Sequence, residues 1–477
     1  MDAIKKPCYN TKDEDHISKL PDFLIHHILS FVNIKHAVQT CILSKRWRNI
    51  WTSLPFLTFD RSVLSEGVYQ RFLDFVEYVL SFRDNRCFDI RRFHLLGRRG
   101  KSECFIKCLH RWIIVVARSN VEDIYVQFCG DKYNDEFRVP DCVFTCKSLT
   151  NLELDLSTSC KIILPNSISL PRLRYLKLKN TSFNHDELTK LCSSCPVLEH
   201  LDLSGVRSTT PLNITISSLT LKHLDISGIS TTAPLNISIS SLTLEHLVIS
   251  DISTTAPVNI TISSVTLKHF KLHIDESIRN TLRLYAPNLV YLVLSNLDYM
   301  LLEDVSSLVT ADVRVQVKPR KLLNDEFPTA ADTLESLKPL QNVRELTISF
   351  QPLKVAETRD SDSSDYSSDD SSDDSSDDES EYVGSDLGSE PEQGMDSTAV
   401  DPQELLANTM KHLKYVEISG LEGSDIELKF IEILIKNAMV LKKMVLKNPY
   451  RSKIKKFYEE VEKFPSACSS LKTYFYL

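Results

Sequence analysis

The chain has 477 residues, of which 42% are hydrophobic and 25% charged, and its formal net charge is −8 at neutral pH. This composition can build more than one folded domain, while the polar first fifteen residues and the lack of an apolar run of about 20 residues predict neither a signal peptide nor a membrane span. We therefore expect a nuclear or cytoplasmic protein whose twelve cysteines form no disulfide framework.

Between residues 20 and 51 a helix start signal precedes apolar residues at helical spacing. Leu20-Pro21-Asp22 places a proline and an acid in a first helical turn, where both are favourable. Two apolar stripes follow, made of Leu24, Ile25, Ile28, Leu29 and Val32, then Val38, Ile42, Leu43, Trp47 and Trp51. So short a segment cannot bury them all in a core of its own, so we expect a partner to cover part of them. The simpler alternative is that the two tryptophans only close a small helical core.

This stretch, from Asp15 to Trp51, resembles an F-box, and we assign residues 13–60 to it. The resemblance implies binding to a Skp-type adaptor and, through it, to a cullin-based ubiquitin ligase. The residues that match the family pattern, and that contact the adaptor or support the contact surface, are Leu20, Pro21, Leu24, Ile28, Leu29, Val38, Leu43 and Trp47.

A less regular stretch follows, in which a helix over Glu103–Asn120 precedes a strand over Val121–Val126. This unit resembles the first repeat of plant F-box proteins with leucine-rich repeats. Basic residues between Arg91 and Lys101 come just before it, but they lack the interleaved aromatic residues of a nucleic-acid site, so no nucleic-acid partner is predicted.

A Leu-x-x-Leu-x-Leu pattern then recurs every 22 to 25 residues from Leu149 to Leu294. This period predicts a leucine-rich-repeat solenoid, assigned to 88–350, with strands lining the concave side of an arc. Residues 212–234 and 235–257 are nearly identical copies, and their alternating Asn-Ile-Thr/Ser-Ile segments predict extended rather than helical return segments.

Strand alternation predicts which side chains of these repeats face the concave surface. One candidate substrate-facing row is Tyr175, His200, His223, His246, His269 and Tyr291, and the next is Lys177, Asp202, Asp225, Val248, Lys271 and Val293. The histidines could meet an acidic or phosphorylated partner or a metal, or they could simply have been copied by duplication. We predict neither a metal site nor a cofactor, because Cys192-x-x-Cys195 also lacks a second ligand pair.

An acidic Ser/Asp-rich tract, assigned to 357–398, interrupts the repeats. Sixteen acids and one base lie between Glu357 and Asp396, so removing the tract changes the net charge from −8 to +7. Its composition predicts disorder. The tract could be a passive loop, or its serines could be substrates of an acid-directed kinase.

Repeat-like sequence resumes after the tract, with Leu413, Val416 and Ile418 followed by a helical run over Ile426–Val440. Residues 403–477 resemble the FBD region that ends many plant F-box proteins. The predicted fold is therefore α/β, a short N-terminal helical F-box followed by a leucine-rich-repeat solenoid with an α/β C-terminal cap.

The sequence contains no recognisable catalytic motif, and its histidines and carboxylates follow the repeat. The resemblance implies a non-catalytic substrate-recognition subunit of a Skp–cullin–F-box ubiquitin ligase, whose repeats bind the protein to be ubiquitinated. The alternatives are a ligase-independent interaction scaffold and a small-molecule receptor of the F-box class. The identity of the protein substrate cannot be read from the sequence.

Overall fold

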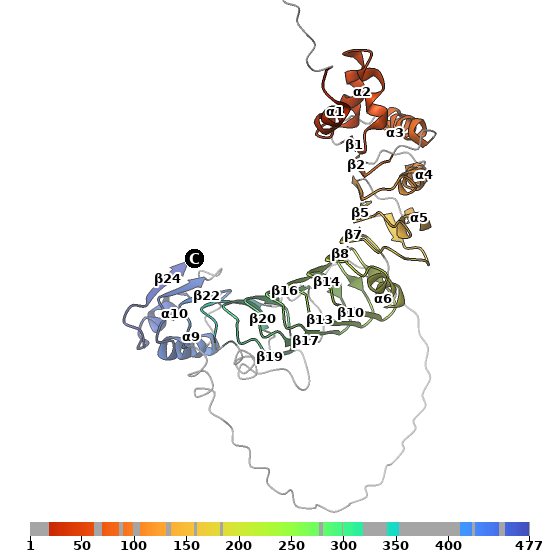
Figure 1. The fold of residues 1–477 in the computed structure, drawn as a ribbon. Helices are drawn as coiled ribbons and strands as arrows, with labels where there is room; N and C mark the ends of the chain where they lie inside the picture. The colour runs from red at the N-terminus through yellow and green to blue at the C-terminus, as the bar shows by residue number, and fades with distance from the viewer. Residues whose placement is uncertain are drawn as a thin grey trace, which may run out of the picture.

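The computed structural model describes residues 19–61, 69–84, 89–98, 105–129, 135–156, 160–181, 185–275, 280–297, 299–317, 340, 342–352, 411–421, 425–447 and 454–476. They form a curved solenoid with a helical segment at its N-terminal end (Figure 1). The predicted acidic tract and the first residues of both the predicted F-box and the predicted FBD-like region lie outside the described residues.

Short helices make up the N-terminal segment: α1 (Asp22–Leu29), α2 (Ile34–Gln39), η1 (Thr40–Ile42) and η2 (Trp47–Ser53). Helix α1 begins directly after Pro21, and the Asn33 side chain caps α2 by accepting a hydrogen bond from the Lys35 N–H at 3.0 Å. The faces turned inward bury Ile25, Leu29, Ile34, Ala37, Trp47, Ile50 and Trp51. Both tryptophans thus belong to the core of this segment.

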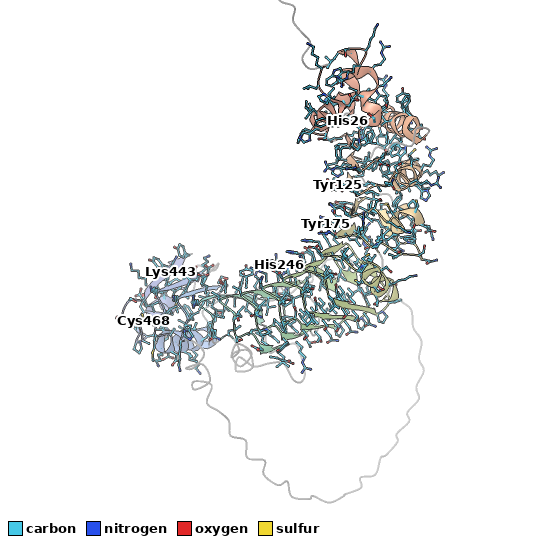
Figure 2. All side chains as sticks on the ribbon, viewed as in Figure 1. His26, Tyr125, Tyr175, His246, Lys443 and Cys468 are labelled. Atoms are coloured by element: carbon cyan, nitrogen blue, oxygen red, sulfur yellow. The ribbon has the colours of Figure 1, made fainter. Side chains whose placement is uncertain are left out.

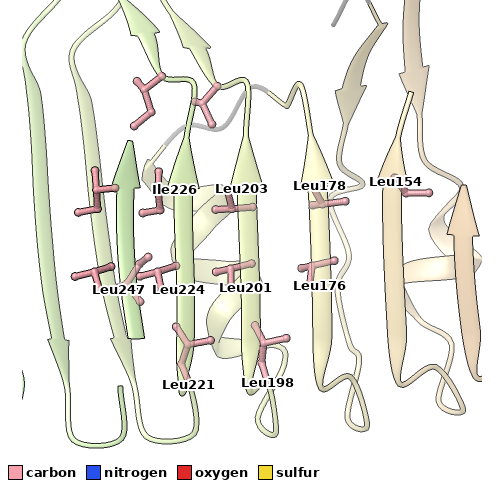
Figure 3. Packing of buried hydrophobic residues seen from close by; sticks show 14 of the residues in the cluster. Leu154, Leu176, Leu178, Leu198, Leu201, Leu203, Leu221, Leu224, Ile226 and Leu247 are labelled. Atoms are coloured by element: carbon pink, nitrogen blue, oxygen red, sulfur yellow. The ribbon is translucent and has the colours of Figure 1, made fainter. Parts of the chain in front are cut away.

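The concave side of the arc is lined by parallel strands in register. In order of pairing they are β1 (Phe56–Asp60), β2 (Arg92–Arg98), β3 (Asp123–Cys129), β5 (Asn151–Asp155), β7 (Tyr175–Lys179), β8 (His200–Ser204), β11 (His223–Ser227), β14 (His246–Thr254), β16 (His269–Ile274), β18 (Tyr291–Ser295), β20 (Thr310–Val317), β21 (Glu345–Pro352), β22 (Tyr415–Ser419), β23 (Lys443–Lys447) and β24 (Lys472–Tyr476). The second and fourth residues of the repeat strands point inward, and Figure 3 shows Leu176, Leu201 and Leu224 side by side in the core. This alternation leaves the first, third and fifth residues for the concave face.

The sheet begins inside the segment that the sequence assigns to the F-box. Strand β1 pairs in parallel with β2 from Phe56 to Asp60 and buries Leu57 and Phe59. Helices α3 (Tyr69–Asp84) and α4 (Phe105–Ala117) cover the outer side, and the Trp112 Nε1–H donates a hydrogen bond to Glu77 Oε2 between them at 2.6 Å. The helical segment and the solenoid therefore share one continuous core.

The convex side changes from helical to extended along the chain (Figure 1). It starts with α3, α4, α5 (Asp141–Phe144) and α6 (His185–Ser193), and short strands occur at β4 (Asp135–Arg138), β6 (Cys160–Ile163), β9 (Arg207–Ser208) and β12 (Ser230–Thr231). The duplicated repeats then form a five-stranded sheet of β10 (Leu212–Ser218), β13 (Leu235–Ser241), β15 (Val258–Ser263), β17 (Asn280–Tyr285) and β19 (Tyr299–Asp304). The prediction of extended return segments is confirmed: within β13 and β15 alternate Ile side chains are buried, and the Asn, Ser and Thr side chains between them face outward.

The C-terminal part continues the same architecture. Strand β22 pairs in register with β21 and then with β23, so that Glu345, Tyr415 and Lys443 lie in one row. Helices α9 (Asp425–Asn437) and α10 (Ile454–Val461) cover the convex side. The α/β C-terminal cap is thus itself built from repeat units, and its inner residues join the common core.

Candidate protein-interaction surfaces

Seven large apolar side chains of the N-terminal segment are exposed to solvent. They lie on α1, in the turn after it and at the end of η1, and they are Phe23, Leu24, Ile28, Phe31, Val32, Ile42 and Leu43. Ile42 is 85% exposed, Phe31 77% and Phe23 69%. We call these seven residues the F-box apolar surface. A concentration of this kind marks a site for another protein.

The predicted adaptor-binding residues divide into three groups. Pro21, Leu24, Ile28 and Leu43 are exposed, whereas Leu20 and Val38 are half-buried against the core. Leu29 and Trp47 are buried, so in this structure they can only support the surface from below. Their part in adaptor binding stays a prediction.

Four residues of this surface were not among the predicted adaptor-binding residues: Phe23, Phe31, Val32 and Ile42. No motif marks these residues. The only sequence signal is that all but Val32 lie outside the inward stripe of Ile25 and Leu29, in a segment too short to bury a second stripe. Polar contacts also join the helices of this segment: Arg46 pairs with Asp22 at 2.5 Å, and His26 Nε2 lies 3.0 Å from Ser53 Oγ.

The predicted row of histidines forms a stack on the concave face. His200, His223, His246 and His269 lie directly opposite one another on β8, β11, β14 and β16. Their ring centroids are 4.2, 4.6 and 4.5 Å apart, with interplanar angles of 6°, 4° and 9°. Tyr175 and Tyr291 flank the stack at 6.0 and 6.2 Å. In Figure 2, Tyr175 and His246 lie on this inner side of the arc.

Stacking makes protonation of the inner histidines unfavourable. Partial burial lowers the pKa of His223 and of His246, and the neighbouring histidines lower both further, since adjacent imidazolium ions would repel each other. At neutral pH the inner rings of the stack are therefore uncharged and present ring nitrogens that can accept or donate a hydrogen bond.

The second row carries most of the fixed charge. Lys177 Nζ lies 3.2 Å from Asp202 Oδ2 and 3.7 Å from Glu153 Oε1. Burial opposes the charge of Lys177, but the two carboxylates outweigh it and raise the pKa of this lysine. Further along the row, Lys271 is exposed and Val293 is buried, so Val293 departs from the expected outward position.

A hollow of about 190 Å³ lies between the two rows. We call it the histidine pocket, and its lining residues are Tyr175, His200, Leu201, Asp202, His223, Leu224, Asp225, His246 and Val248. The structure therefore brings together seven of the twelve residues in the two predicted rows, while Lys271 and Tyr291 lie further along the arc.

Neither candidate metal site gathers suitable ligands. Among the described residues, no group of three or more His, Cys, Asp or Glu side chains could hold a metal ion. Burial raises the pKa of Cys192 to about 11 and that of Cys195 to about 12, so both thiols are protonated at neutral pH and are poor ligands. Within the same part of the chain, no helix is both long and apolar enough to span a membrane.

Comparison with known families agrees with the three parts of the fold. The F-box domain matches residues 17–59, the leucine-rich repeats of the FBD-associated F-box protein At5g56370 match residues 109–266, and FBD matches residues 409–446.

Curated relatives from Arabidopsis thaliana match in part. The putative F-box/FBD/LRR-repeat protein At3g59240 is 36% identical over 43% of this chain and 41% of its own length. F-box/LRR-repeat protein 13 is 35% identical over 40% of this chain and 41% of its own length, and FBD-associated F-box protein At4g10400 is 34% identical over 43% and 49%. The chain thus spans less than half the length of these relatives. Together with the three family matches, they show a plant F-box protein with leucine-rich repeats and a C-terminal FBD region.

Proposed function

We propose that this chain is the substrate-recognition subunit of a Skp–cullin–F-box ubiquitin ligase. The observation that carries the proposal is the F-box apolar surface, whose seven exposed side chains lie between Phe23 and Leu43. A Skp-type adaptor would cover these side chains and link the chain to a cullin. The concave face would then hold the protein to be ubiquitinated.

The proposed mechanism requires no catalytic group in this chain. A tethered substrate meets the ubiquitin-conjugating enzyme at a raised effective concentration, and this proximity is the only contribution that the recognition subunit makes. The proposal places the complex in the nucleus or cytoplasm and assigns it no cofactor. The buried Cys146, Cys160 and Cys195 are free thiols, which is compatible with a reducing compartment.

The proposal is tested by binding purified Skp adaptor to the full chain and to an Ile42→Asp variant. Because Ile42 is 85% exposed, the substitution leaves the fold intact, but adaptor binding would have to bury the new carboxylate. We expect binding at least about tenfold weaker than that of the unaltered chain, measured by isothermal titration calorimetry.

Leu219→Asp is the matched control, since Leu219 is 74% exposed in the turn after β10, on the solenoid. It should bind the adaptor as the unaltered chain does. If the unaltered chain does not bind at all, the ligase role is wrong and a ligase-independent scaffold becomes the better explanation. Equal weakening by both variants would show that the F-box apolar surface is not the site that contacts the adaptor.

A further inference from the structure

The histidine pocket has an acidic wall that the surrounding residues neutralise only in part. Asp202 and Asp225 lie opposite each other on β8 and β11, and among the lining residues they alone carry a fixed charge. The nearest basic side chain, Lys177, pairs with Asp202 and with Glu153. Lys177 thus pairs with two of the three carboxylates in the neighbouring strands, and Asp225 is the third.

Asp225 is the carboxylate left without a counter-ion. It is half-buried and makes no ion pair with any residue that the structure describes, and its Oδ1 is buried without a hydrogen-bond partner there. Burial raises its pKa and the neighbouring Asp202 raises it further, while Lys177 and a side-chain hydrogen bond with Ser227 lower it by less. A cation placed beside Asp225 would relieve this unfavourable environment.

The histidine stack does not supply that cation. Its inner rings are uncharged at neutral pH because partial burial lowers their pKa, and because two charged rings would lie only about 4.5 Å apart. On the neighbouring rim, Lys268 pairs with Glu245 at 2.7 Å, while Lys222 and Arg174 share Glu199 at 3.0 and 3.3 Å. These basic side chains have carboxylate partners of their own, and the residues that line the pocket carry negative charge, which argues against the acidic or phosphorylated partner considered from the sequence.

We infer that the histidine pocket receives an arginine side chain from a basic segment of the partner protein. A guanidinium group offers five N–H donors in a planar fork, which suits two adjacent carboxylates and neutral ring nitrogens. Its alkyl stem would pack on Val248, at the end of the pocket. The volume of about 190 Å³ is small for a drug-sized ligand and suits a single side chain.

This inference rests on the proposed function, because it names the chemical class of substrate that the concave face would hold. It is tested without any adaptor, so failure of adaptor binding and failure of this inference are separate results. The probe is a fluorescein-labelled Gly/Ser peptide of about twelve residues with two arginines, measured by fluorescence anisotropy at neutral pH. Its twin carries citrulline, which keeps the shape of arginine and removes the charge.

We expect the arginine peptide to bind the unaltered chain about tenfold or more tightly than the citrulline peptide, the usual gain from a charge-assisted hydrogen bond. In an Asp225→Asn variant this preference should disappear. The isosteric change removes a half-buried, unpaired charge, so the variant should fold, and its thermal midpoint is checked alongside.

Asp312→Asn is the matched control. Asp312 occupies the same position on β20, its Oδ1 is likewise buried without a described partner, and burial likewise raises its pKa, but it lies beyond the pocket. The acidic tract is present in both variants, so any general attraction for basic peptides affects them equally. The arginine preference should persist in Asp312→Asn.

Three results would overturn the inference. The first is no measurable binding of the arginine peptide up to about 1 mM. The second is an equal loss of the arginine preference in both variants, which would indicate attraction to the whole acidic surface. The third is that a phosphoserine peptide of the same length binds more tightly than the arginine peptide, which would show that the site prefers anionic partners.

Discussion

A single backbone position in each repeat decides how the chain leaves the concave strand. Gly228 and Asp251 occupy this position in the two duplicated copies, with φ of 63° and 54°, in the left-handed region that favours glycine. At Gly228 a Cβ would lie 3.1 Å from the backbone nitrogen of Gly205 in the preceding turn. The copies therefore differ in strain although they share the same geometry.

Gly228→Ala should lower the free energy of unfolding by about 1–2 kcal/mol, because alanine pays the left-handed penalty and crowds the neighbouring turn. The reciprocal change, Asp251→Gly, should be neutral or raise it by up to about 1 kcal/mol. Thermal unfolding followed by circular dichroism measures both. Destabilisation of similar size by the two changes would show that the left-handed geometry does not determine the preference for glycine at this position.

Stability should also depend on pH through the histidine stack. The folded pKa of His223 and His246 is lowered from about 6.5, so the unfolded chain takes up protons first as the pH falls. The stabilising effect is present above that value and is lost as the pH drops through it. Glu153 and Asp225, whose pKa values burial raises, act in the opposite direction at lower pH.

The measurement is the thermal midpoint between about pH 7.5 and 5.5. A His223→Gln/His246→Gln variant should lose less stability over this range than the unaltered chain, because two of the groups that resist protonation are gone. His36→Gln, on the exposed face of α2, is the control and should keep the full dependence. An unchanged pH dependence in the double variant would contradict this role of the stack.

Within a repeat, the inward leucines carry the stability. Leu247 on β14 is 1% exposed, and we expect Leu247→Ala to cost about 2–5 kcal/mol through lost burial and the cavity left behind. Leu242, in the turn before the same strand, is 62% exposed, so Leu242→Ala should change stability by no more than about 0.5 kcal/mol. Urea unfolding compares the two variants. A similar loss of unfolding free energy in both variants would show that burial of the inward leucines does not determine the stability of the repeat.

The same leucines explain how much of the fold the sequence could predict. Their spacing determines the strand, its inward face and the row occupied by each neighbour, so the stack from His200 to His269 followed from the pattern alone. Strand β1 did not, because Leu57 and Phe59 give too short an alternation to distinguish from a loop.

The sites were less predictable than the strands. In the F-box, helical spacing places Ile28 and Leu29 in the same apolar stripe, so exposed Ile28 and buried Leu29 could not be separated. On the concave face, the row of Asp225 was predictable, whereas its missing counter-ion depends on Lys177 turning toward Asp202 and Glu153, which no sequence pattern encodes.

At the scale of the whole molecule, the strands on either side of a long chain insertion pair directly with each other. Pairing of β21 with β22 brings Glu345 opposite Tyr415, although the chain between Pro352 and Lys411 lies outside the described residues. The pairing surfaces are the buried Leu346 and Ile348 on one strand and Val416 and Ile418 on the other. Since loop-closure entropy grows only slowly with length, the cost of the insertion is small against this burial.

Deleting residues 357–398 should therefore leave the repeats on both sides paired and the thermal midpoint unchanged or slightly higher. Shortening the loop recovers about 1 kcal/mol of closure entropy, and it also changes the net charge from −8 to +7. Thermal unfolding and hydrogen exchange of the β22 amides measure the result. The matched control replaces the same residues with an equally long Gly/Ser linker, which removes the charge but keeps the loop length. If exchange at β22 rises in both variants, the acidic tract holds the C-terminal repeats in place, and its role is structural as well as electrostatic.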